Sequence, residues 1–560
     1  MTVVQAEHSA DSAGDRLPPG TFRLIDIDGN MRGQHADGEG EDDIILMPQP
    51  SLDPEDPLNW TFRRKVIQTS CVVLYTIVIA IPSSAVYSIV TPLRKETDLS
   101  LQDINNGTGI MFLFYGWGCI FWQAMALQCG KRPIYLFSLL ATIVILATAP
   151  LCKEPGPYLA NRIILGFFGS PVESLCEISI ADIWFTHQRG KYMAWYGWSL
   201  ALCGKLAPML SGFINVGQGW KWTLYWCAIW NAMGFIYCFF LMEETNYDRK
   251  HDELPPQRVA PVSQASTQEG DGDGDGDGDG DGEKTVTLDT TSSDLGESAE
   301  IQWPRKTYLQ KLSIKDKPRP NRIVQIMIAP FKGFTYPAVV YAGLMYGANS
   351  LVWQGFQNAT IGTIYTLEYG FSTAGVAAAY SGGVIGTIIG GYYCGKIGPM
   401  LTVRLARRNG GISEPEHTLY LFIASIFLVP TAMILYGLGV TYKWHWMVLV
   451  ITQVFMAMNA ALCVAGALNY AIGSYMELSG SMVTTCVLIR NTMSFATNFG
   501  VTPWLKATNY MVVYLTVAGI GLLWNASLFI MTRYGKAMRE WTAQRYWRDV
   551  ERARAKGLGH

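Results

Sequence analysis

Long apolar runs alternate with short polar loops over most of the chain. A helix needs about 20 mainly apolar residues to cross the hydrocarbon core of a bilayer. Runs of that length predict six early and six late membrane spans. They cover residues 66–91, 108–128, 133–152, 157–183, 191–214 and 220–242, and then 336–362, 372–396, 419–440, 445–472, 480–503 and 509–533. The pattern therefore predicts an all-α integral membrane protein with twelve transmembrane helices in two six-helix bundles.

Two polar tails and one polar linker flank and separate two apolar bundles, which gives the chain five parts. These are a polar N-terminal tail (1–62), a first transmembrane bundle (63–245), a linker (246–335), a second transmembrane bundle (336–535) and a C-terminal tail (536–560). The centre of the linker repeats Gly-Asp from Gly270 to Gly282. Because such a repeat can bury no apolar surface, we expect a flexible acidic linker.

The distribution of Lys and Arg predicts the orientation in the membrane. With a cytosolic N-terminus, the inside segments carry Arg63, Arg64, Lys65, Lys131, Arg132, Arg189, Lys191, Lys396, Arg404, Arg407, Arg408, Arg533, Lys536 and Arg539, whereas each outside loop carries at most two basic residues. Because cytosolic loops are enriched in Lys and Arg, both termini and the linker are predicted to be cytosolic. Asn106, in an Asn-Gly-Thr sequon, then falls in the first outside loop as a candidate glycosylation site.

Composition excludes several other classes of function. Charged residues make up 16% of the chain, against about 25% in an average soluble domain, and the net charge of −2 gives no attraction for nucleic acid. The eleven cysteines include no CxxC pair, and the seven histidines lie in tails, in loops or at span edges. We therefore expect no disulfide framework, metal or cofactor. The spans hold no nucleophile–His–acid set, so the protein is not predicted to be an enzyme.

Ionisable residues inside the spans are the main candidates for function. A charge near mid-bilayer costs roughly 2.5–3.5 kcal/mol on insertion scales, so it must face a partner or a wet cavity. Glu173 and Glu177 lie one turn apart in the fourth span, and Arg162 lies nearer the outside end of the same helix. Two adjacent carboxylates cannot both ionise cheaply in such a site, so one is expected to exchange protons.

Lys205, near mid-depth in the fifth span, is the fourth member of this proton-coupling and substrate set. If the fourth and fifth spans are antiparallel, Lys205 comes near the height of Glu173, and we expect these two side chains to interact. Protonation of a glutamate would then change the pairing and bias which side of the cavity opens. The alternative is a static ion pair that locks two helices together.

Polar and aromatic residues of the second half are candidates for a cavity wall. They are Trp353, Gln354, Asn358, Asn459 and Arg490. Amides beside aromatic rings could bind an amphipathic substrate, or they could bond between helices, which is worth about 0.6 kcal/mol on average. Arg490 requires a partner or water, and gating and structural roles are both open for it.

Three segments outside the spans carry the most specific motifs. They are Asp56-Pro-Leu-Asn-Trp60 with Arg63-Arg-Lys65, Glu243-Glu-Thr-Asn-Tyr-Asp-Arg249, and Arg407-Arg-Asn-Gly-Gly-Ile-Ser-Glu-Pro-Glu416. They resemble segments of fungal major facilitator superfamily transporters in the twelve-span, drug:proton antiporter-like family. That branch includes polyamine and cation permeases and metabolite exporters. The resemblance implies the major facilitator fold, with two bundles facing each other across a central cavity.

Two further motifs match the family in part. Gly130, Lys131 and Arg132 match the loop that helps to latch the cytosolic gate in the family, but Leu127 stands where the family has Asp. Small or bent positions that would let helices pack closely are Pro208 and Gly212 in the fifth span and Gly382, Gly386 and Gly390 in the eighth. The family's antiporter motif is otherwise altered, by Ala207 and Ser211.

Together these observations predict a proton-coupled secondary transporter that works by alternating access. We expect it to be a monomer in the fungal plasma membrane that exports a small organic compound, with the substrate, protons and the lipid bilayer as its partners. Related sequences tend to have a neutral polar residue in place of Lys205, so this pocket is expected to prefer a neutral or anionic substrate. The alternatives are a polyamine or organic-cation permease and a nontransporting receptor on the same fold.

Overall fold

The computed structural model describes residues 18–23, 53–247, 307–313, 321–409 and 412–555. The described chain is almost entirely helical. One pair of two-residue strands, β1 (Phe22–Arg23) and β2 (Ile412–Ser413), runs antiparallel. The Gly-Asp repeat of the predicted linker lies outside the described residues.

All six early spans are helical, some with a break. Their elements are α2 (Phe62–Ser84), η2 (Ala85–Ser88) and α3 (Val90–Glu96); α4 (Leu101–Cys129); α5 (Lys131–Thr148) and η3 (Ala149–Leu151); α6 (Pro155–Gly169) and α7 (Pro171–Ile183); α8 (Thr186–Gln218); and α9 (Trp220–Leu241). A short 3₁₀ turn, η1 (Pro57–Asn59), precedes them.

The six late spans are helical as well. Their elements are α12 (Pro337–Gly347), η4 (Ala348–Val352) and α13 (Trp353–Leu367); α14 (Thr373–Ala379), α15 (Ser381–Tyr392), η5 (Tyr393–Ile397) and α16 (Gly398–Arg408); η6 (Pro415–Phe422) and α17 (Ile423–Thr441); α18 (Met447–Ser474) and η7 (Met476–Leu478); α19 (Ser479–Ala507); and α20 (Tyr510–Ala526) and α21 (Leu528–Ala555). Before them come α10 (Tyr308–Lys311) and α11 (Ile323–Gly333).

Within the described chain, ten helical segments are long and apolar enough to cross a membrane. An eleventh is formed by α11 and the segment Pro337–Leu367, which are long and apolar enough when taken together and meet at a bend of 84°. The twelfth predicted span is α19, which has 29 residues but carries many polar side chains on its buried face, including Arg490, Asn491 and Asn498. The run of mainly apolar residues at 480–503 predicted this span, although α19 is less apolar than the ten segments above.

The polar face of α19 packs against α4 and is not turned to lipid. The amide of Asn105 donates to the hydroxyl of Thr502 at 2.9 Å, and the hydroxyl of Thr484 donates to Gln123 at 2.6 Å. A Cβ added at Gly116 of α4 would come within 2.7 Å of the Asn491 Cβ, so the two helices touch closely. This seam joins the first half of the chain to the second.

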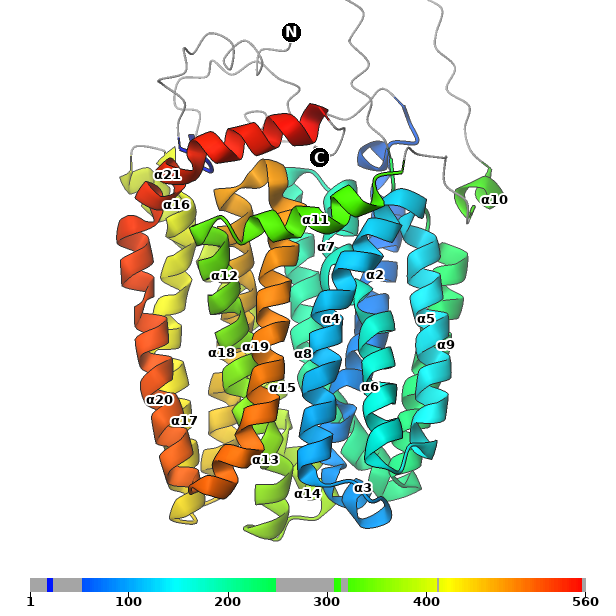
Figure 1. Ribbon diagram of the computed structural model, residues 1–560, viewed down its shortest axis with the longest axis vertical. Helices are drawn as coiled ribbons and strands as arrows, with labels where there is room; N and C mark the ends of the chain where they lie inside the picture. The colour runs from blue at the N-terminus through cyan, green and yellow to red at the C-terminus, as the bar shows by residue number, and fades with distance from the viewer. Residues whose placement is uncertain (1–17, 24–52, 248–306, 314–320, 410–411, 556–560) are drawn as a thin grey trace, which may run out of the picture.

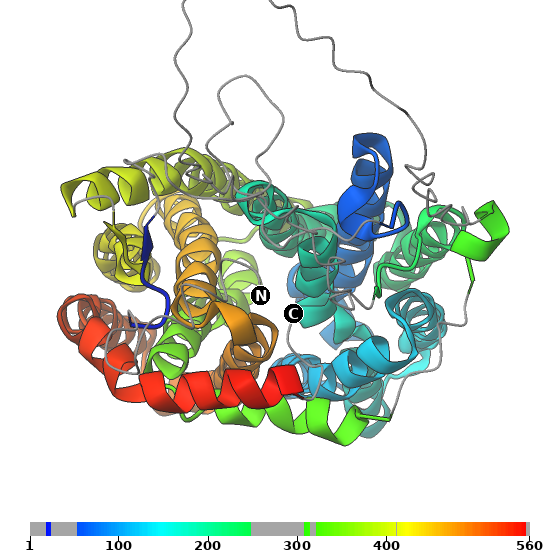
Figure 2. The same ribbon diagram turned by 90° about the horizontal axis from the view of Figure 1, so that it is seen from above.

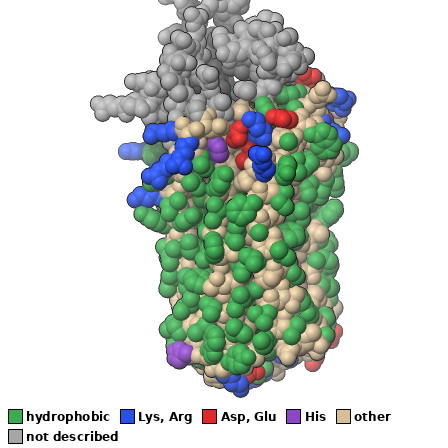
Figure 3. Space-filling view, turned by 90° about the vertical axis from the view of Figure 1, so that its left-hand side faces the viewer, with side chains coloured by type: hydrophobic (Ala, Val, Ile, Leu, Met, Phe, Trp, Pro, Cys, Tyr) green, Lys and Arg blue, Asp and Glu red, His purple; other side chains and the backbone are tan. Residues whose placement is uncertain are grey.

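The helices form two groups that stand side by side, one from each half of the chain (Figures 1 and 2). The start of α2 and the end of α21 lie at the same end of the molecule, which we call the termini face. At this face α11 and the last part of α21 lie across the ends of the upright helices. Figure 3 shows hydrophobic side chains over the middle of one side, with Lys and Arg gathered towards the termini face. Such an apolar belt with a basic rim is typical of a membrane protein.

Two predicted placements are wrong. Asn106 does not lie in a loop but in the second turn of α4, where its side chain is half-buried and accepts a bond from Gln102 at 3.4 Å. The start of α4 is fixed by a capping box between Ser100 and Asp103, a signal that apolar run length does not contain. Part of the predicted flexible linker is helical, because α11 packs against α4 and α19.

The predicted packing glycines lie at close helix contacts. Added Cβ atoms at Gly382, Gly386 and Gly390 would come within 2.3–2.9 Å of α18 atoms. Gly212 of α8 lies equally close to the Cβ of Ala377 in α14 (2.4 Å for an added Cβ), four residues after Pro208 inside the same helix. Small residues thus let α15 approach α18 and let α8 approach the second bundle.

Candidate functional site

A buried ion pair joins the two bundles near the middle of the fold. Nη2 of Arg490, from α19, donates to Oε1 of Glu173, from α7, and both side chains are only 5% exposed. Nη1 of the same guanidinium donates to the hydroxyl of Tyr346 at 2.6 Å. The guanidinium also lies 4.9 Å from the centre of the Tyr346 ring. One arginine of the second bundle thus binds a carboxylate of the first.

A break in the fourth span places Glu173 in the first turn of a new helix. Pro171 has no N–H, so the carbonyl of Phe167 is free and accepts the indole N–H of Trp122 at 2.8 Å. Helix α7 begins at Pro171, and the N–H of Glu173 donates to the carbonyl of Ser170 at 3.0 Å. A helix N-terminus favours a negative side chain in its first turn. The break therefore places the buried Glu173 carboxylate at a helix start, where its charge is favoured.

Glu177 lies one turn farther along α7 and is also buried, at 6% exposed. Its Oε2 has no hydrogen-bond partner in the part of the chain that the structure describes. Glu173, Arg490 and Arg189 are near enough to act on it electrostatically. One guanidinium therefore has two carboxylates within its reach and is bonded to one of them.

The predicted contact between Glu173 and Lys205 is not among the described contacts. The chain reverses between the end of α7 and the start of α8, and at the height of Glu173 the neighbour is Tyr196, whose hydroxyl donates to the carbonyl of Val172 at 2.8 Å. Lys205 lies nine residues beyond Tyr196, about 13 Å farther along the helix at 1.5 Å per residue. The prediction failed because α8 begins five residues before the apolar run does.

Arg162 also lies apart from the two glutamates. It comes from α6, is 4% exposed, and its Nη1 donates a long hydrogen bond to the Met111 sulfur at 3.9 Å. Its Nε has no partner among the described residues. The guanidinium lies 5.1 Å from the Tyr158 ring centre, in a small pocket also lined by Asn161 and Trp220. The predicted four-residue set is thus divided into three places.

Two of the predicted cavity amides bond between helices. Nε2 of Gln354 donates to the carbonyl of Met456 at 3.0 Å, and Nδ2 of Asn459 donates to both oxygens of Asn349, each at 3.2 Å. These bonds fasten α13 and η4 to α18. Asn358 is half-buried.

Trp353 lines a shallow, mostly apolar groove on the side of the second bundle. The groove runs between η4, α19 and α20, and its wall includes Met493, Ile520 and Trp524. The Trp353 ring faces Gly521, where an added Cβ would lie 3.9 Å away. It therefore packs towards α20, and none of the described contacts joins it to Arg490.

Lys131 and Arg132 of the gate motif bind partners that were not predicted from the sequence. Lys131 forms an ion pair with Asp182, and the backbone N–H groups of Lys131 and Arg132 donate to the two Glu244 oxygens, each at 3.0 Å. Burial raises the pKa of the Glu244 carboxyl. Three backbone N–H groups, those of Lys131, Arg132 and Asn246, donate to the carboxylate and lower the pKa, but the effect of burial is larger. Glu244 thus caps α5, which begins directly after Gly130. The sequence contained one indication of this cap, because Glu244 is the second glutamate of the motif that follows the sixth span.

We expect Glu244→Ala to lower the free energy of unfolding by about 1–2 kcal/mol, because two N–H groups at the start of α5 lose their acceptor. The measurement is heat-induced unfolding of the purified protein in detergent. Glu154→Ala is the matched control, since Glu154 stands at the N-cap of α6 without a side-chain capping bond and is exposed. Equal losses in the two variants would contradict the capping role.

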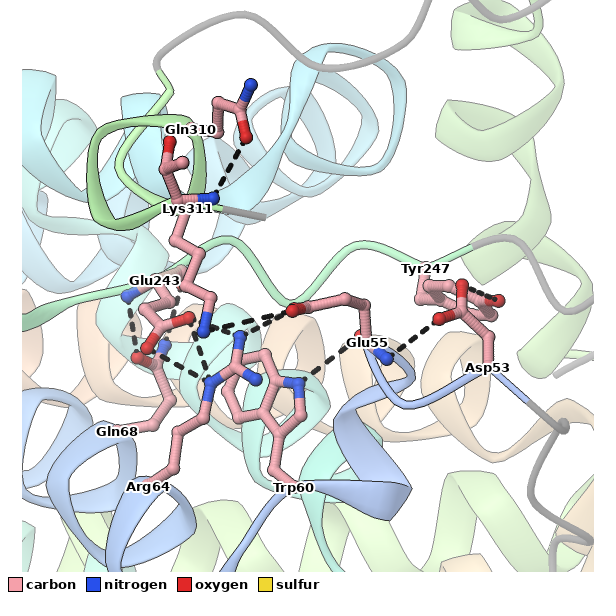
Figure 4. Close-up of polar contacts among 10 residues, drawn as sticks. Asp53, Glu55, Trp60, Arg64, Gln68, Glu243, Tyr247, Gln310 and Lys311 are labelled. Atoms are coloured by element: carbon pink, nitrogen blue, oxygen red, sulfur yellow. Dashed lines mark hydrogen bonds and ion pairs between the residues drawn. The ribbon is translucent and has the colours of Figure 1, made fainter. Parts of the chain in front are cut away.

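Two of the motif segments meet at the termini face. Arg64 donates from Nε to Glu243 at 3.0 Å and from Nη2 to Glu55 at 2.9 Å (Figure 4). Gln68 and the backbone of Glu243 exchange two hydrogen bonds, of 2.8 and 3.0 Å. The guanidinium of Arg64 also lies 4.0 Å from the Trp60 ring centre. We call these residues the entry cluster, because they join the start of the first span to the end of the sixth.

The third motif segment binds the C-terminal helix. Arg539 of α21 donates to both oxygens of Glu416, at 2.9 and 2.6 Å, and it also binds the carbonyl of Pro19. Gly20, with φ of +80°, passes so close to the backbone of Gly473 that a side chain would collide. The described N-terminal residues therefore dock on the second bundle.

Comparison with known proteins agrees with this architecture. Residues 72–498 match the family model described as Major Facilitator Superfamily. The chain belongs to this superfamily. An uncharacterized MFS-type transporter of Schizosaccharomyces pombe is 24% identical over 547 residues, which is 94% of each chain. The efflux pump bik6 of Gibberella fujikuroi is 28% identical over 221 residues, 39% of this chain and 45% of the pump.

Solved structures share the fold at low sequence identity. The crystal structure of the human organic anion transporter MFSD10 is 14% identical and superposes with a TM-score of 0.52, over 83% of this chain and 99% of that one. Membership of the Major Facilitator Superfamily makes this protein a multi-pass membrane transporter and not an enzyme. It also confirms the predicted fold class.

Proposed function

We propose that this protein is a proton-coupled secondary transporter that exports a small organic compound across the fungal plasma membrane, with both termini in the cytosol. The single observation that carries the proposal is the buried Glu173–Arg490 pair between the bundles, with Glu177 one turn away. An ionisable group inside the membrane is costly and is usually retained for coupling or transport.

The ion pair must break when the two bundles move apart at this point during alternating access. Rocking of one bundle against the other changes distances across their interface, and this pair crosses that interface. Breaking a buried pair leaves two uncompensated charges, each of which is expensive away from water. The pair therefore biases the protein towards the conformation in which it is made.

Glu177 supplies a way for a proton to change that bias. When Glu177 is ionised, it competes with Glu173 for Arg490; when it is protonated, Glu173 holds Arg490 alone. A proton that binds or leaves Glu177 thus changes the strength of the link between the bundles. This is a coupling between proton binding and conformation, as linkage requires.

Export is supported by the efflux pump bik6, which matches part of this chain. The cytosolic position of the termini is supported by exposed Lys396, Arg404, Arg407 and Arg408 at the termini face, as the positive-inside rule expects of a cytosolic face. The Asn106 glycosylation predicted from the sequence is not part of this proposal, because Asn106 lies in a helix.

Purified protein in liposomes tests the proposal. Three probes share one phenylbutyl body: 4-phenylbutane-1-sulfonate, 4-phenylbutyramide and (4-phenylbutyl)trimethylammonium. Their charges do not change with pH, so a pH gradient does not itself redistribute them. With an acid lumen, exchange of one proton for one molecule should concentrate a transported neutral probe up to about tenfold per pH unit, since one unit is 1.36 kcal/mol. The membrane potential is clamped at zero for all three probes, because exchange of a proton for a neutral molecule also moves a net charge.

The result expected is accumulation that exceeds protein-free liposomes and vanishes when an ionophore removes the gradient. Accumulation driven by an alkaline lumen instead would show uptake with protons and contradict export. A preference for the trimethylammonium probe would favour the organic-cation permease. Binding of a probe without any movement across the membrane would favour a nontransporting receptor.

A further inference from the structure

Lys205 is a buried cation with no described counter-ion. It is 7% exposed. Neither an ion pair nor a hydrogen bond links its side chain to any residue that the structure describes. Buried charges in proteins are paired in the great majority of cases, so a solitary lysine inside the membrane requires an explanation.

The side chain of Lys205 lies at the interface between the bundles. An added Cβ at Gly383 of α15 would come within 2.9 Å of the Lys205 Cδ and within 3.1 Å of its Cγ. The aliphatic stem therefore crosses from α8 to a glycine of the second bundle. The absence of a side chain at Gly383 is what leaves room for it. Lys205 thus lies where the two halves meet and where substrate passes in alternating access.

The five ionisable residues predicted from the sequence to lie within the spans are unequal in sign. Arg162, Lys205 and Arg490 are cationic, whereas Glu173 and Glu177 are acidic. Among these five, only Glu173 and Arg490 form a described ion pair, and Arg162 lies apart in the first bundle. When Glu177 carries a proton, two cations have no carboxylate. A positively charged substrate would increase this excess of positive charge, and a negatively charged substrate would reduce it.

We propose that Lys205 is the counter-ion for an organic anion, whose carboxylate or sulfonate group binds at the α8–α15 interface during transport. This inference rests on the proposed transport function and names its substrate class. The ammonium supplies a compact charge with three donors, and the apolar helices around it suit the hydrocarbon body of such a molecule. A polycation would meet repulsion at the same place.

Binding of the three phenylbutyl probes to the purified protein tests the proposal without a proton gradient. The sulfonate is expected to bind more tightly than the amide, and the trimethylammonium probe least. Lys205→Met should weaken sulfonate binding by about 30-fold or more, as removal of one partner from a desolvated pair does, and should leave amide binding within about threefold. Lys205→Arg should keep the preference for the anion.

Two further variants separate charge from folding. Gly383→Ala keeps the charge but crowds the stem, and it should weaken sulfonate binding less than Lys205→Met does. Lys221→Met removes an exposed lysine at the start of α9 and should leave sulfonate binding unchanged. Unchanged sulfonate affinity in Lys205→Met, preference of the wild type for the cation, or no sulfonate binding at millimolar concentration would each overturn the proposal.

A failure of the anion-binding proposal can be distinguished from a failure of the proton-coupling proposal. A failure of charge selectivity leaves gradient-driven accumulation of the amide untouched. A failure of proton coupling leaves the order of binding among the three probes unchanged.

Discussion

Replacement of Arg490 by methionine is expected to lower the free energy of unfolding by about 3–5 kcal/mol, because it leaves the Glu173 carboxylate buried without a partner. Glu173→Gln should cost less, since its amide can still accept a bond from the guanidinium, although the arginine keeps an uncompensated charge. The double variant should be more stable than the sum of the two losses predicts. The measurement is unfolding of all four proteins in detergent.

The interaction energy from that cycle distinguishes a link between bundles from two independent sites. Contacting residues in one ion pair show coupling of about 0.5–3 kcal/mol, whereas independent residues add within about 0.5 kcal/mol. Strict additivity would therefore refute the pair. Tyr346→Phe is a useful companion, because it removes the hydroxyl that accepts from Arg490 at 2.6 Å and leaves the ring beneath the guanidinium.

Glu177→Gln is expected to abolish accumulation driven by a pH gradient and to leave exchange without a gradient. The wild type should reach up to about tenfold accumulation of the amide probe per pH unit, and the variant about onefold, because a glutamine cannot carry the proton. The measurement is uptake of labelled amide into liposomes at several gradients, together with counterflow at equal pH. Glu154→Gln, at the exposed N-cap position before α6, is the control.

A double variant, with both Glu173 and Glu177 changed to Gln, decides the wider proposal. If it still concentrated the probe against its gradient with an unaltered pH response, neither glutamate would couple protons. If Glu177→Gln alone retained full accumulation while Glu173→Gln lost it, the proton site would be Glu173 and the roles assigned to the two would be exchanged.

The sequence was sufficient for the fold because membrane spans are encoded locally. Each predicted span is a continuous apolar run, and lipid accepts little else. The span at 480–503 was predicted as an apolar run like the others, although the polar face of α19 lies against α4. The start of α4 was misjudged because its capping box lies in polar residues that an apolar window ignores, and Asn106 was placed in a loop as a result.

The site was predicted only in part, because pairing depends on which helices meet. Glu173, Glu177, Lys205 and Arg490 could all be chosen from the cost of charge in the membrane, but that cost says nothing about partners. Glu173 was assigned to Lys205 by chain proximity, whereas its partner comes from 317 residues away. Glu244 was missed because a carboxylate just outside a span carries no such cost.

The entry cluster has a consequence for how such transporters can be recombined. Arg64 and Glu243 are 179 residues apart in the chain yet form one bonded unit, and both belong to the first half. A chimaera that swaps a whole half with another transporter inherits the unit intact. A crossover placed anywhere between the first and sixth spans would separate an arginine selected in one lineage from a glutamate selected in another.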